Sequence, residues 1–400
     1  MNDVSPMVAR IKESPTVAIF GKALAMKRAG QDVISVSGGE PDFDTPDHVK
    51  EAAIRAIRGG ETKYTAVDGT AALKDAIIAK FNRENGLSYA PDQISVGTGG
   101  KQVIFNAMLA SIAPGDEVII PRPYWVSYPD IALLAGGVPV FVDCPRNNRF
   151  KLRPEDLEQA ITPRSRWLIL NSPSNPTGAA YTADELKAIA EVALRHPRLM
   201  ILSDDIYEHL IYDEFEFRTI ASVAPALAER TVTVNGASKA FCMTGWRIGY
   251  GGGPKWLIKA MAKLQGQCTN NPCSVSQAAA VAALTGPQDF IAEHNVIYKQ
   301  RRDLAVDLLN KVEGITCDRP EGAFYLYPSI AGLIGKRAPD GRVIENDGVF
   351  AEYLLDSVGV AVVPGAGFGL SPYMRIAYPI ATEDLREACL RIQRASAALR

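Results

Sequence analysis

The sequence has few of the features that mark secreted, metal-binding or membrane proteins. Its six cysteines are scattered over 400 residues without a Cys-x-x-Cys pair, which argues against both a disulfide framework and a zinc site. No stretch reaches the roughly 20 apolar residues that a membrane span needs, and the N-terminus lacks the basic and apolar regions of a signal peptide. We therefore expect a metal-free protein of the reducing cytoplasm.

A dominant charge and a dinucleotide motif are also missing. The 43 basic residues nearly balance the 45 acidic ones, so no bulk field favours nucleic acid or an anionic membrane. The four histidines are not clustered, and we assign them no catalytic role. The segment 97–102 fails the GxGxxG pattern because Gln102 stands where the third glycine is required. These absences leave small molecules as the expected partners.

What the sequence does contain is an alternation of short apolar strands and helices from about residue 94 to 250. Several strands are continuous apolar runs, as expected of a mostly parallel sheet that is covered on both faces. Strands are predicted at residues 93–96, 117–121, 138–142, 167–171, 199–203, 231–234 and 248–251. The sequence therefore predicts an α/β fold whose large domain, residues 46–290, contains a seven-stranded sheet flanked by helices.

The remaining segments predict a smaller α/β domain. Beyond about residue 290 the pattern changes to a long charged helix around 298–311, short strands, and an amphipathic helix that begins at Thr382. We expect residues 1–45 to join residues 291–400 in this domain. Within the large domain, Thr182 and Glu185 form a capping box, which predicts the start of a helix at that point.

Polar residues follow several of the predicted strands, where ligands bind in open α/β sheets. Gly99, Gly100 and Lys101 follow the first strand and lead into an apolar helix, whose start could hold a phosphate. An ordinary glycine-rich turn explains these residues equally well. Asp204 and Tyr207 follow another strand. The carboxylate could keep a pyridine nitrogen protonated, and the tyrosine could donate to a ring hydroxyl oxygen.

A lysine and an arginine eight residues apart follow the sixth predicted strand. Lys239 would be nucleophilic if burial or a nearby cation lowered its pKa, and Arg247 can bind a phosphate through two parallel hydrogen bonds. A lysine in such a place is usually a solvated surface residue. However, Asn175 lies in a loop stiffened by two prolines and can present a fixed amide to a phenolate-like oxygen. Together these groups indicate pyridoxal 5′-phosphate as the cofactor.

With these segments, the chain resembles the class I aminotransferases of the pyridoxal-phosphate fold type I superfamily, most closely the bacterial aspartate aminotransferase branch. The likeness runs from about residue 10 to the end. Its motifs lie at residues 37–43, 63–65, 174–178, 204 with 207, 236–239 with 247, and 374–376. The resemblance implies ping-pong transfer of an amino group from an L-amino acid, with aspartate and glutamate favoured, to a 2-oxo acid such as oxaloacetate or 2-oxoglutarate.

The resemblance also implies a role for each site residue. Lys239 would bond to the cofactor aldehyde and carry the substrate proton, with Asp204 and Tyr207 as the other catalytic residues. The other cofactor contacts implied are Gly99, Gly100, Lys101, Trp125, Asn175, Gly236, Arg247 and Tyr64. The substrate contacts implied are Gly39, Trp125, Asn175, Arg375 and, for a second carboxylate, Lys101 or Lys12. Tyr64 would come from a second subunit, which implies a homodimer with shared active sites.

Several alternatives stay open at this point. Related enzymes of this branch also accept prephenate through a lysine and a threonine in a segment like 12–16, so an aromatic or prephenate aminotransferase is a second interpretation. A lyase or decarboxylase would keep the same lysine, aspartate and arginine. A cofactor-sensing regulator would need a DNA-binding module ahead of the likeness, which already begins near residue 10. Asp205 and Ser174 stand where the family usually has Glu and Asn, which bears on the substrate rather than on the reaction class.

Overall fold

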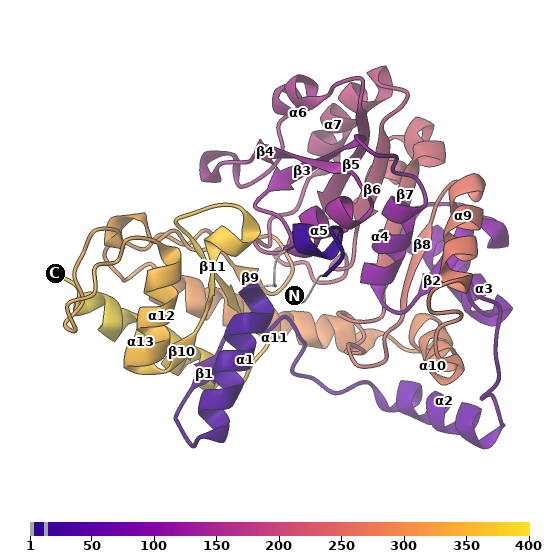
Figure 1. The fold of residues 1–400 in the computed structure, drawn as a ribbon. Helices are drawn as coiled ribbons and strands as arrows, with labels where there is room; N and C mark the ends of the chain where they lie inside the picture. The colour runs from indigo at the N-terminus through magenta and orange to yellow at the C-terminus, as the bar shows by residue number, and fades with distance from the viewer. Residues whose placement is uncertain (1–3, 12–14) are drawn as a thin grey trace.

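The central feature of the computed structural model, which describes residues 4–11 and 15–400, is a seven-stranded sheet (Figure 1). In sheet order its strands are β2 (Ile94–Gly97), β8 (Gly249–Gly252), β7 (Thr231–Gly236), β6 (Met200–Asp204), β5 (Ser165–Asn171), β3 (Glu117–Arg122) and β4 (Val138–Asp143). Within this sheet β8 is antiparallel to both neighbours, and the other adjacent pairs are parallel. The predicted mostly parallel α/β sheet is confirmed, with every strand within two residues of its expected limits.

Helices cover both faces of this sheet. One layer comprises α4 (Gly100–Leu109), α5 (Ser127–Leu134) and α9 (Lys255–Gly266), and the other comprises α6 (Pro154–Ala160), α7 (Ala183–Arg195) and α8 (Ile220–Val223). The apolar run of β5 packs against both helix layers, because neighbouring residues of a strand point to opposite faces of the sheet. Trp167 and Ile169 pack with the first layer, and Leu168 and Leu170 pack with the second. For the inner strands, covered on both faces, the ends are therefore the parts left to contact a ligand.

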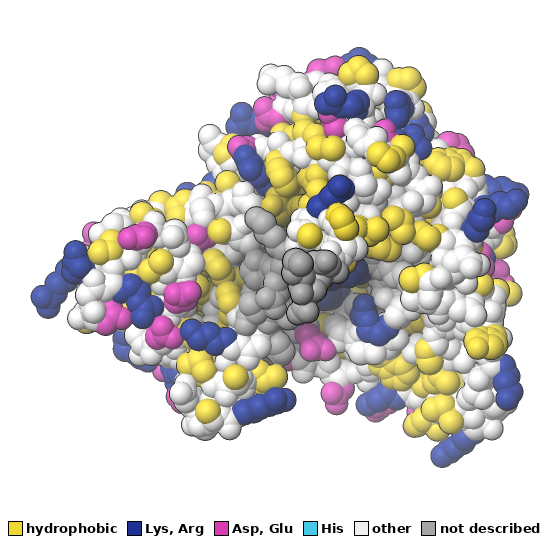
Figure 2. Space-filling view, viewed as in Figure 1, with side chains coloured by type: hydrophobic (Ala, Val, Ile, Leu, Met, Phe, Trp, Pro, Cys, Tyr) yellow, Lys and Arg dark blue, Asp and Glu magenta, His cyan; other side chains and the backbone are white. Residues whose placement is uncertain are grey.

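Three more helices pack at the β2 edge of the sheet. They are α2 (Asp47–Arg58), α3 (Ala71–Lys80), which continues into the π-helix η2 (Phe81–Asn85), and α10 (Ser274–Thr285). Figure 2 shows hydrophobic side chains gathered at the surface over α2 and α10. Ile54 and Ile57 of α2 are among the exposed large hydrophobic residues. This side of the molecule therefore carries apolar surface that the described residues leave exposed.

The C-terminal region builds a second hydrophobic core. It contains α11 (Asp289–Leu309), α12 (Asp347–Val358), α13 (Thr382–Ala397), β9 (Tyr325–Leu326), β10 (Val360–Ala361), β11 (Val363–Pro364) and β12 (Met374–Ala377). N-terminal segments lie against it (Figure 1): β1 (Ile34–Ser35) pairs in parallel with β10, and α1 (Pro15–Arg28) contacts β10 and β11. The division into domains at residues 45/46 and 290/291 stays a prediction.

Two expected helix starts have opposite outcomes. The capping box is confirmed, because Thr182 Oγ1 accepts from the Glu185 N–H at 3.3 Å and a Glu185 carboxylate oxygen accepts from the Thr182 N–H at 2.7 Å. The expected start of α11 near Tyr298 is wrong, since the helix begins at Asp289. Pro287 and the acidic Asp289 are the start signals that the sequence offered there. Among the described helices, none combines the length and the apolar composition that a membrane crossing needs.

Candidate active site

A cavity of about 460 Å³ opens at the carboxyl edge of the sheet, where an α/β fold is expected to bind its ligand. Its walls come from segments that follow β2, β3, β5, β6 and β7, and from β9 and β12 of the C-terminal region. Ten of the residues predicted for the site line this cavity. They are Gly39, Gly100, Lys101, Trp125, Asn175, Asp204, Tyr207, Lys239, Arg247 and Arg375.

Lys239 places a half-buried amine in this cavity, in the turn that follows β7. Its Nζ donates a hydrogen bond to the backbone oxygen of Gly39 at 2.6 Å, so its partner there is neutral. Burial, and next the charge of Arg375, lower the pKa of Lys239 to about 8. The neutral form, which is the nucleophile, is therefore accessible near neutral pH.

Asp204 places a buried carboxylate at the end of β6. Burial raises its pKa to about 6. The hydroxyl of Tyr128 opposes that effect by donating to Asp204 Oδ2 at 2.6 Å. A carboxylate in this setting is favoured in its charged form by any cationic group of a ligand that pairs with it.

Arg247 has donors to spare beside the glycines at the start of α4. Its two hydrogen bonds go to backbone oxygens, those of Thr244 at 2.8 Å and Thr98 at 3.5 Å. Gly99 has a φ of +85°, and a Cβ atom there would lie 2.1 Å from Nη2 of Arg247, so a side chain cannot be accommodated without moving the guanidinium. The N–H groups of Gly100 and Lys101, which begin α4 directly after this glycine, have no hydrogen-bond partner among the described residues. Together they form a wall suited to an anion.

Arg375 is a buried guanidinium on β12 whose hydrogen-bond partners are neutral. Nη1 donates to Oδ1 of Asn175 at 3.0 Å, and Nη2 donates to the backbone oxygen of Ser37 at 2.6 Å. Its guanidinium carbon lies 4.7 Å from the ring centroid of Tyr325 and 5.0 Å from that of Phe368. Nε has no hydrogen-bond partner among the described residues. Such a group is suited to a carboxylate ligand, which would supply the missing negative charge.

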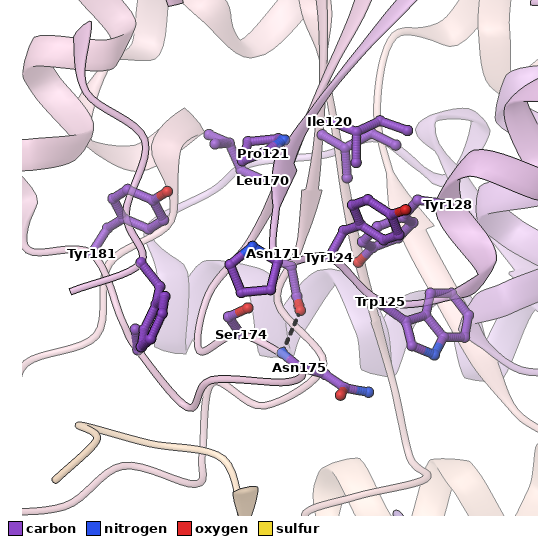
Figure 3. Close-up of a pocket in the computed structure, with 14 residues that line it drawn as sticks. Ile120, Pro121, Tyr124, Trp125, Tyr128, Leu170, Asn171, Ser174, Asn175 and Tyr181 are labelled. Carbon is purple, nitrogen blue, oxygen red and sulfur yellow. Dashed lines mark hydrogen bonds between the residues drawn. The ribbon is translucent and has the colours of Figure 1, made fainter. Parts of the chain in front are cut away.

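Trp125 and Tyr128 form an aromatic wall (Figure 3). Together with Asn171 and Asn175 they also line a small pocket that adjoins the main cavity. The rings of Trp125 and Tyr128 meet edge to face with centroids 5.2 Å apart. Nζ of Lys101 lies 4.9 Å from the Trp125 ring centroid. The indole is thus held by neighbours and can offer a flat face to a ligand ring.

Four predicted site residues lie elsewhere. Gly99 contacts Arg247 but does not line the cavity, and Gly236 has its N–H bonded to Asn235 Oδ1 at 2.7 Å. Tyr64 is 88% exposed and lines a separate surface depression. Lys12 lies outside the described residues. The roles assigned to these four residues stay predictions, as do those of the cavity residues.

Sequence reasoning overlooked two tyrosines of the cavity. Tyr128 binds the Asp204 carboxylate, and Tyr325 Oη lies 2.6 Å from Tyr207 Oη. Tyr128 stands three residues after Trp125, in the segment that follows the predicted strand 117–121, and this position was a usable signal. Tyr325 gave no such signal, because it reaches the cavity from the distant β9 strand. None of the four histidines lines the cavity.

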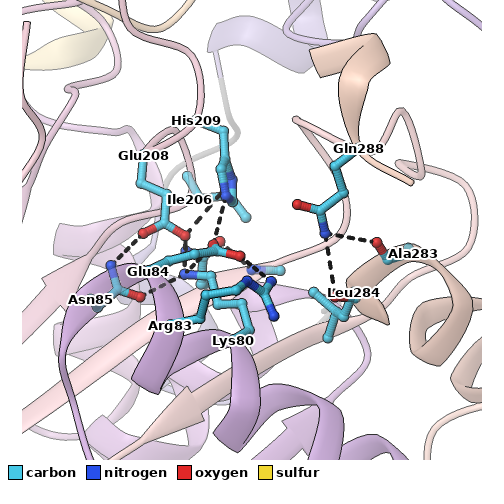
Figure 4. Close-up of polar contacts among 12 residues, drawn as sticks. Lys80, Arg83, Glu84, Asn85, Ile206, Glu208, His209, Ala283, Leu284 and Gln288 are labelled. Atoms are coloured by element: carbon cyan, nitrogen blue, oxygen red, sulfur yellow. Dashed lines mark hydrogen bonds and ion pairs between the residues drawn. The ribbon is translucent and has the colours of Figure 1, made fainter. Parts of the chain in front are cut away.

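A buried polar cluster joins the site to the end of α3 (Figure 4). Glu208, the residue after Tyr207, is paired with Lys80 and accepts hydrogen bonds from Asn85 Nδ2 at 2.7 Å and Asn235 Nδ2 at 2.6 Å. Burial opposes the ionisation of Glu208, but the Lys80 charge leaves the pKa of Glu208 below its ordinary value. The hydrogen bond between Glu208 and Asn235 therefore connects the segment after β6, which carries Tyr207, to β7, which leads to the turn of Lys239.

The same cluster brings together three potential metal ligands, from Glu84, Glu208 and His209. The ammonium of Lys80 already stands against both carboxylates, with the Glu84 contact at 3.5 Å. His209 Nε2 is paired with Glu84 at 2.8 Å. Arg83 also pairs with Glu84, so two cations face the two carboxylates, and this ion-pair network needs no metal to balance its charge.

The fold and the cavity define an α/β enzyme in which an amine of lowered pKa, a buried carboxylate and two arginines line one cavity. The chain belongs to the family of aminotransferase class I and II, whose sequence model matches residues 31–392. It is accordingly an aminotransferase, and the resemblance predicted from its motifs is confirmed.

Similar proteins cover the whole chain. The aspartate/prephenate aminotransferase of Cereibacter sphaeroides is 59% identical over 390 residues, which are 98% of each chain. The aspartate aminotransferase of Rhizobium meliloti (strain 1021) is 56% identical over 385 residues, 96% of this chain and 94% of that protein. A crystal structure of the Rhizobium meliloti aspartate aminotransferase has a TM-score of 0.97 at 54% identity and covers both chains completely. The Thermus thermophilus aspartate aminotransferase with maleate has a TM-score of 0.92 at 44% identity, covering 99% of this chain and 100% of that one.

Proposed function

We propose that this aminotransferase exchanges amino groups between aspartate or glutamate and the 2-oxo acids oxaloacetate or 2-oxoglutarate, with pyridoxal 5′-phosphate as its cofactor. The observation that carries the proposal is one cavity that contains Lys239, Asp204 and Arg375 together with Arg247 at the glycine-rich start of α4. The names of the similar proteins, aspartate and aspartate/prephenate aminotransferases, support it.

The residues present fit this cofactor. Arg247 bonds only backbone oxygens among the described residues and lies against a glycine wall, which fits a phosphate. Asp204 is a buried carboxylate whose short hydrogen bond comes from a neutral phenol, which fits a protonated ring nitrogen. Asn175 and Tyr207 would hold the phenolic oxygen, and Trp125 would stack on the ring.

When bound, the cofactor would supply an aldehyde that bonds to amines and a ring that accepts electrons from the substrate Cα. Arg375 would bind the α-carboxylate of the substrate, and its contacts with Asn175 and Ser37 fix its orientation. Asp204 would hold a proton at the ring nitrogen. Nζ of Lys239, whose pKa is lowered to about 8, would take the proton from the substrate Cα and give it to the cofactor carbon that receives the amino group. The second half-reaction would run this proton transfer in reverse.

The second carboxylate of aspartate or glutamate needs a cation of its own. Lys101 lines the cavity beside Trp125, and burial and the charge of Arg247 lower its pKa. Lys12 is the other candidate from the sequence. Prephenate is a second candidate acceptor, because relatives along the full chain are named aspartate/prephenate aminotransferases.

We further propose a homodimer in which Tyr64 completes the site of the partner subunit. Tyr64 is 88% exposed, beside Ala278 and Val281 in a surface depression. Ile54 and Ile57 add exposed apolar surface on α2. Contiguous apolar surface of this kind marks interaction sites.

The cysteines are all unpaired, which fits a location in the cytoplasm.

The test is a panel of amino donors and acceptors on the cofactor-loaded protein. Aspartate and glutamate should be preferred over aromatic donors, with parallel double-reciprocal lines, and borohydride should attach the cofactor to Lys239. Lys239→Ala should abolish both turnover and attachment. Lys101→Ala should raise the KM for the two acidic donors by about tenfold or more and leave aromatic donors unchanged.

Lys263→Ala, at an exposed position on α9, is the matched control and should behave as the wild type. Full activity of Lys239→Ala would contradict the mechanism. Release of CO₂ or ammonia without matching 2-oxo acid and amino acid products would favour a decarboxylase or lyase instead. An equal loss for all donors in Lys101→Ala would assign Lys101 to the phosphate, and a high rate with prephenate would establish the second candidate activity.

A further inference from the structure

We propose that Tyr128 is a positioning residue that holds one oxygen of the Asp204 carboxylate, keeps this group charged, and leaves its other oxygen for the ligand. The inference rests on the proposed function, in which Asp204 pairs with a cationic ring nitrogen. Neither the motifs nor the predicted roles of the site residues include Tyr128.

The two oxygens of Asp204 have unequal surroundings. Tyr128 Oη donates to Oδ2 at 2.6 Å, whereas Oδ1 receives only a long contact of 3.4 Å from the Ile206 N–H among the described residues. Burial, and next the charge of Asp204, hold the pKa of Tyr128 well above its ordinary value, so the phenol keeps its proton and is the donor. One oxygen is therefore occupied by a fixed neutral donor, and the other is free to face a cation.

Tyr128 is itself held rigidly. Its side chain is buried in the core formed by α4, α5 and the central strands, with 2% of its surface exposed. Its ring meets that of Trp125 at an interplanar angle of 81° (Figure 3). The same side chain thus contacts both the indole predicted to stack on the cofactor and the carboxylate predicted to bind its nitrogen. If Asp204 rotated, it would lose the hydrogen bond from Tyr128, unless Tyr128 moved with it and lost its packing against Trp125.

The hydrogen bond also decides the charge of Asp204. The titratable groups around this carboxyl are Tyr128 of α5, Tyr207 and Asp205 beyond β6, and Lys239 beyond β7. Burial favours the neutral acid, and the hydrogen bond from Tyr128 is the largest influence that favours the anion, ahead of the Lys239 charge. Without the phenol hydroxyl, the carboxyl would stay protonated to a higher pH.

A tyrosine with a purely structural role makes a different contact. Tyr181 is equally buried and lines the same small pocket, but its Oη accepts a hydrogen bond from the backbone N–H of Leu152 at 2.8 Å. Removing that hydroxyl should cost stability without touching Asp204. Tyr181→Phe is therefore a matched control for Tyr128→Phe.

The test begins with the cofactor-free protein. The carboxyl infrared band of Asp204 is identified as the band that Asp204→Asn removes, and it is followed against pH. In Tyr128→Phe the pKa of Asp204 should rise by about one unit or more, since a hydrogen bond to a charged group is lost. With pyridoxal phosphate, the dissociation constant should rise about tenfold. The kcat should fall while the KM for aspartate stays unchanged, because Arg375 is untouched.

Tyr181→Phe should lower the Tm and leave the Asp204 titration and the cofactor affinity at their wild-type values. Tyr128→His keeps a ring N–H donor and should recover part of the Asp204 titration. Tyr128→Leu, which also lacks a donor, replaces Tyr128→Phe if that variant does not fold. The proposal is overturned if the Asp204 band titrates as in the wild type when the hydroxyl is absent. A failure of the proposed function would look different, because the wild-type protein itself would then bind no pyridoxal phosphate.

Discussion

At the scale of single residues, Lys239 and Asp204 are both held where their charged forms are unfavourable. Burial lowers the pKa of Lys239 from 10.5 to about 8 and raises that of Asp204 from 3.8 to about 6. At neutral pH each group is charged at some cost to the folded state. A ligand that supplies the opposite charge removes this cost, which is the reason why such groups gather at functional sites.

Lys239→Met should therefore stabilise the cofactor-free protein at pH 7. The folded pKa of Lys239 lies below its unfolded value, so the unfolded chain binds more protons between about pH 8 and 10.5, and wild-type stability rises across this window. The stability advantage of the variant should be largest below pH 8 and fade towards pH 10.5, as measured by urea unfolding at several pH values. Lys263→Met, at an exposed position, should show no such pH-dependent difference. A constant advantage of Lys239→Met at all pH values would contradict the assignment.

The two departures from the family pattern lie outside the cavity lining. Asp205 is buried and accepts a hydrogen bond from the Ser203 hydroxyl at 2.7 Å, and burial raises its pKa to about 7. Ser174 lines the small pocket beside Asn175. Both residues therefore act on the segments that carry site residues, and neither contacts the space in which the substrate would bind.

At the scale of secondary-structure elements, the Lys80–Glu208 pair connects the end of α3 to the segment after β6. Lys80→Met would leave Glu208 charged and buried without its cation, so the free energy of unfolding should fall by about 3–5 kcal/mol. Urea unfolding measures this change. The double variant Lys80→Met with Glu208→Gln should recover part of the lost free energy of unfolding, since it also removes the unpaired charge of Glu208.

Lys50→Met is the matched control, because Lys50 pairs with Asp47 at the surface of α2 and its loss should change stability little. A Lys80→Met variant as stable as this control would contradict a structural role for the buried pair. If Lys80→Met kept full stability but lost cofactor binding, the Lys80–Glu208 pair would belong to the binding site instead.

The elements differ in how well the sequence predicted them. The strands of the central sheet were predictable because each is a run of apolar residues that both faces bury. Strands β1, β9, β10 and β11 have two residues each, too few for a period to show, and β1 pairs with a strand more than 300 residues later. Pairing over such a separation is decided by the packed cores, and local sequence carries no sign of it.

At the scale of the whole molecule, the proposed dimer can be tested by mixing two defective chains. Tyr64→Ala and Lys239→Ala should each be impaired as homodimers. A heterodimer would have one intact site, with Lys239 from one chain and Tyr64 from the other, so purified heterodimer should regain about half of the wild-type activity per dimer. Differently tagged chains, co-expressed and doubly purified, allow this measurement. No gain over the two homodimers, or a monomer by light scattering, would contradict a shared site.

The sequence by itself determined the chemistry available and the order of the elements that carry it. Lys239, Asp204, Asn175, Arg247 and Arg375 were identifiable because each stands in a motif of fixed spacing or directly after an apolar strand. The tertiary structure decided which neighbours act on these groups. Tyr128 and Tyr325, and the burial that shifts the pKa values of Lys239 and Asp204, arise only when distant segments pack together, since burial and electrostatic coupling depend on distance in space and not on distance along the chain.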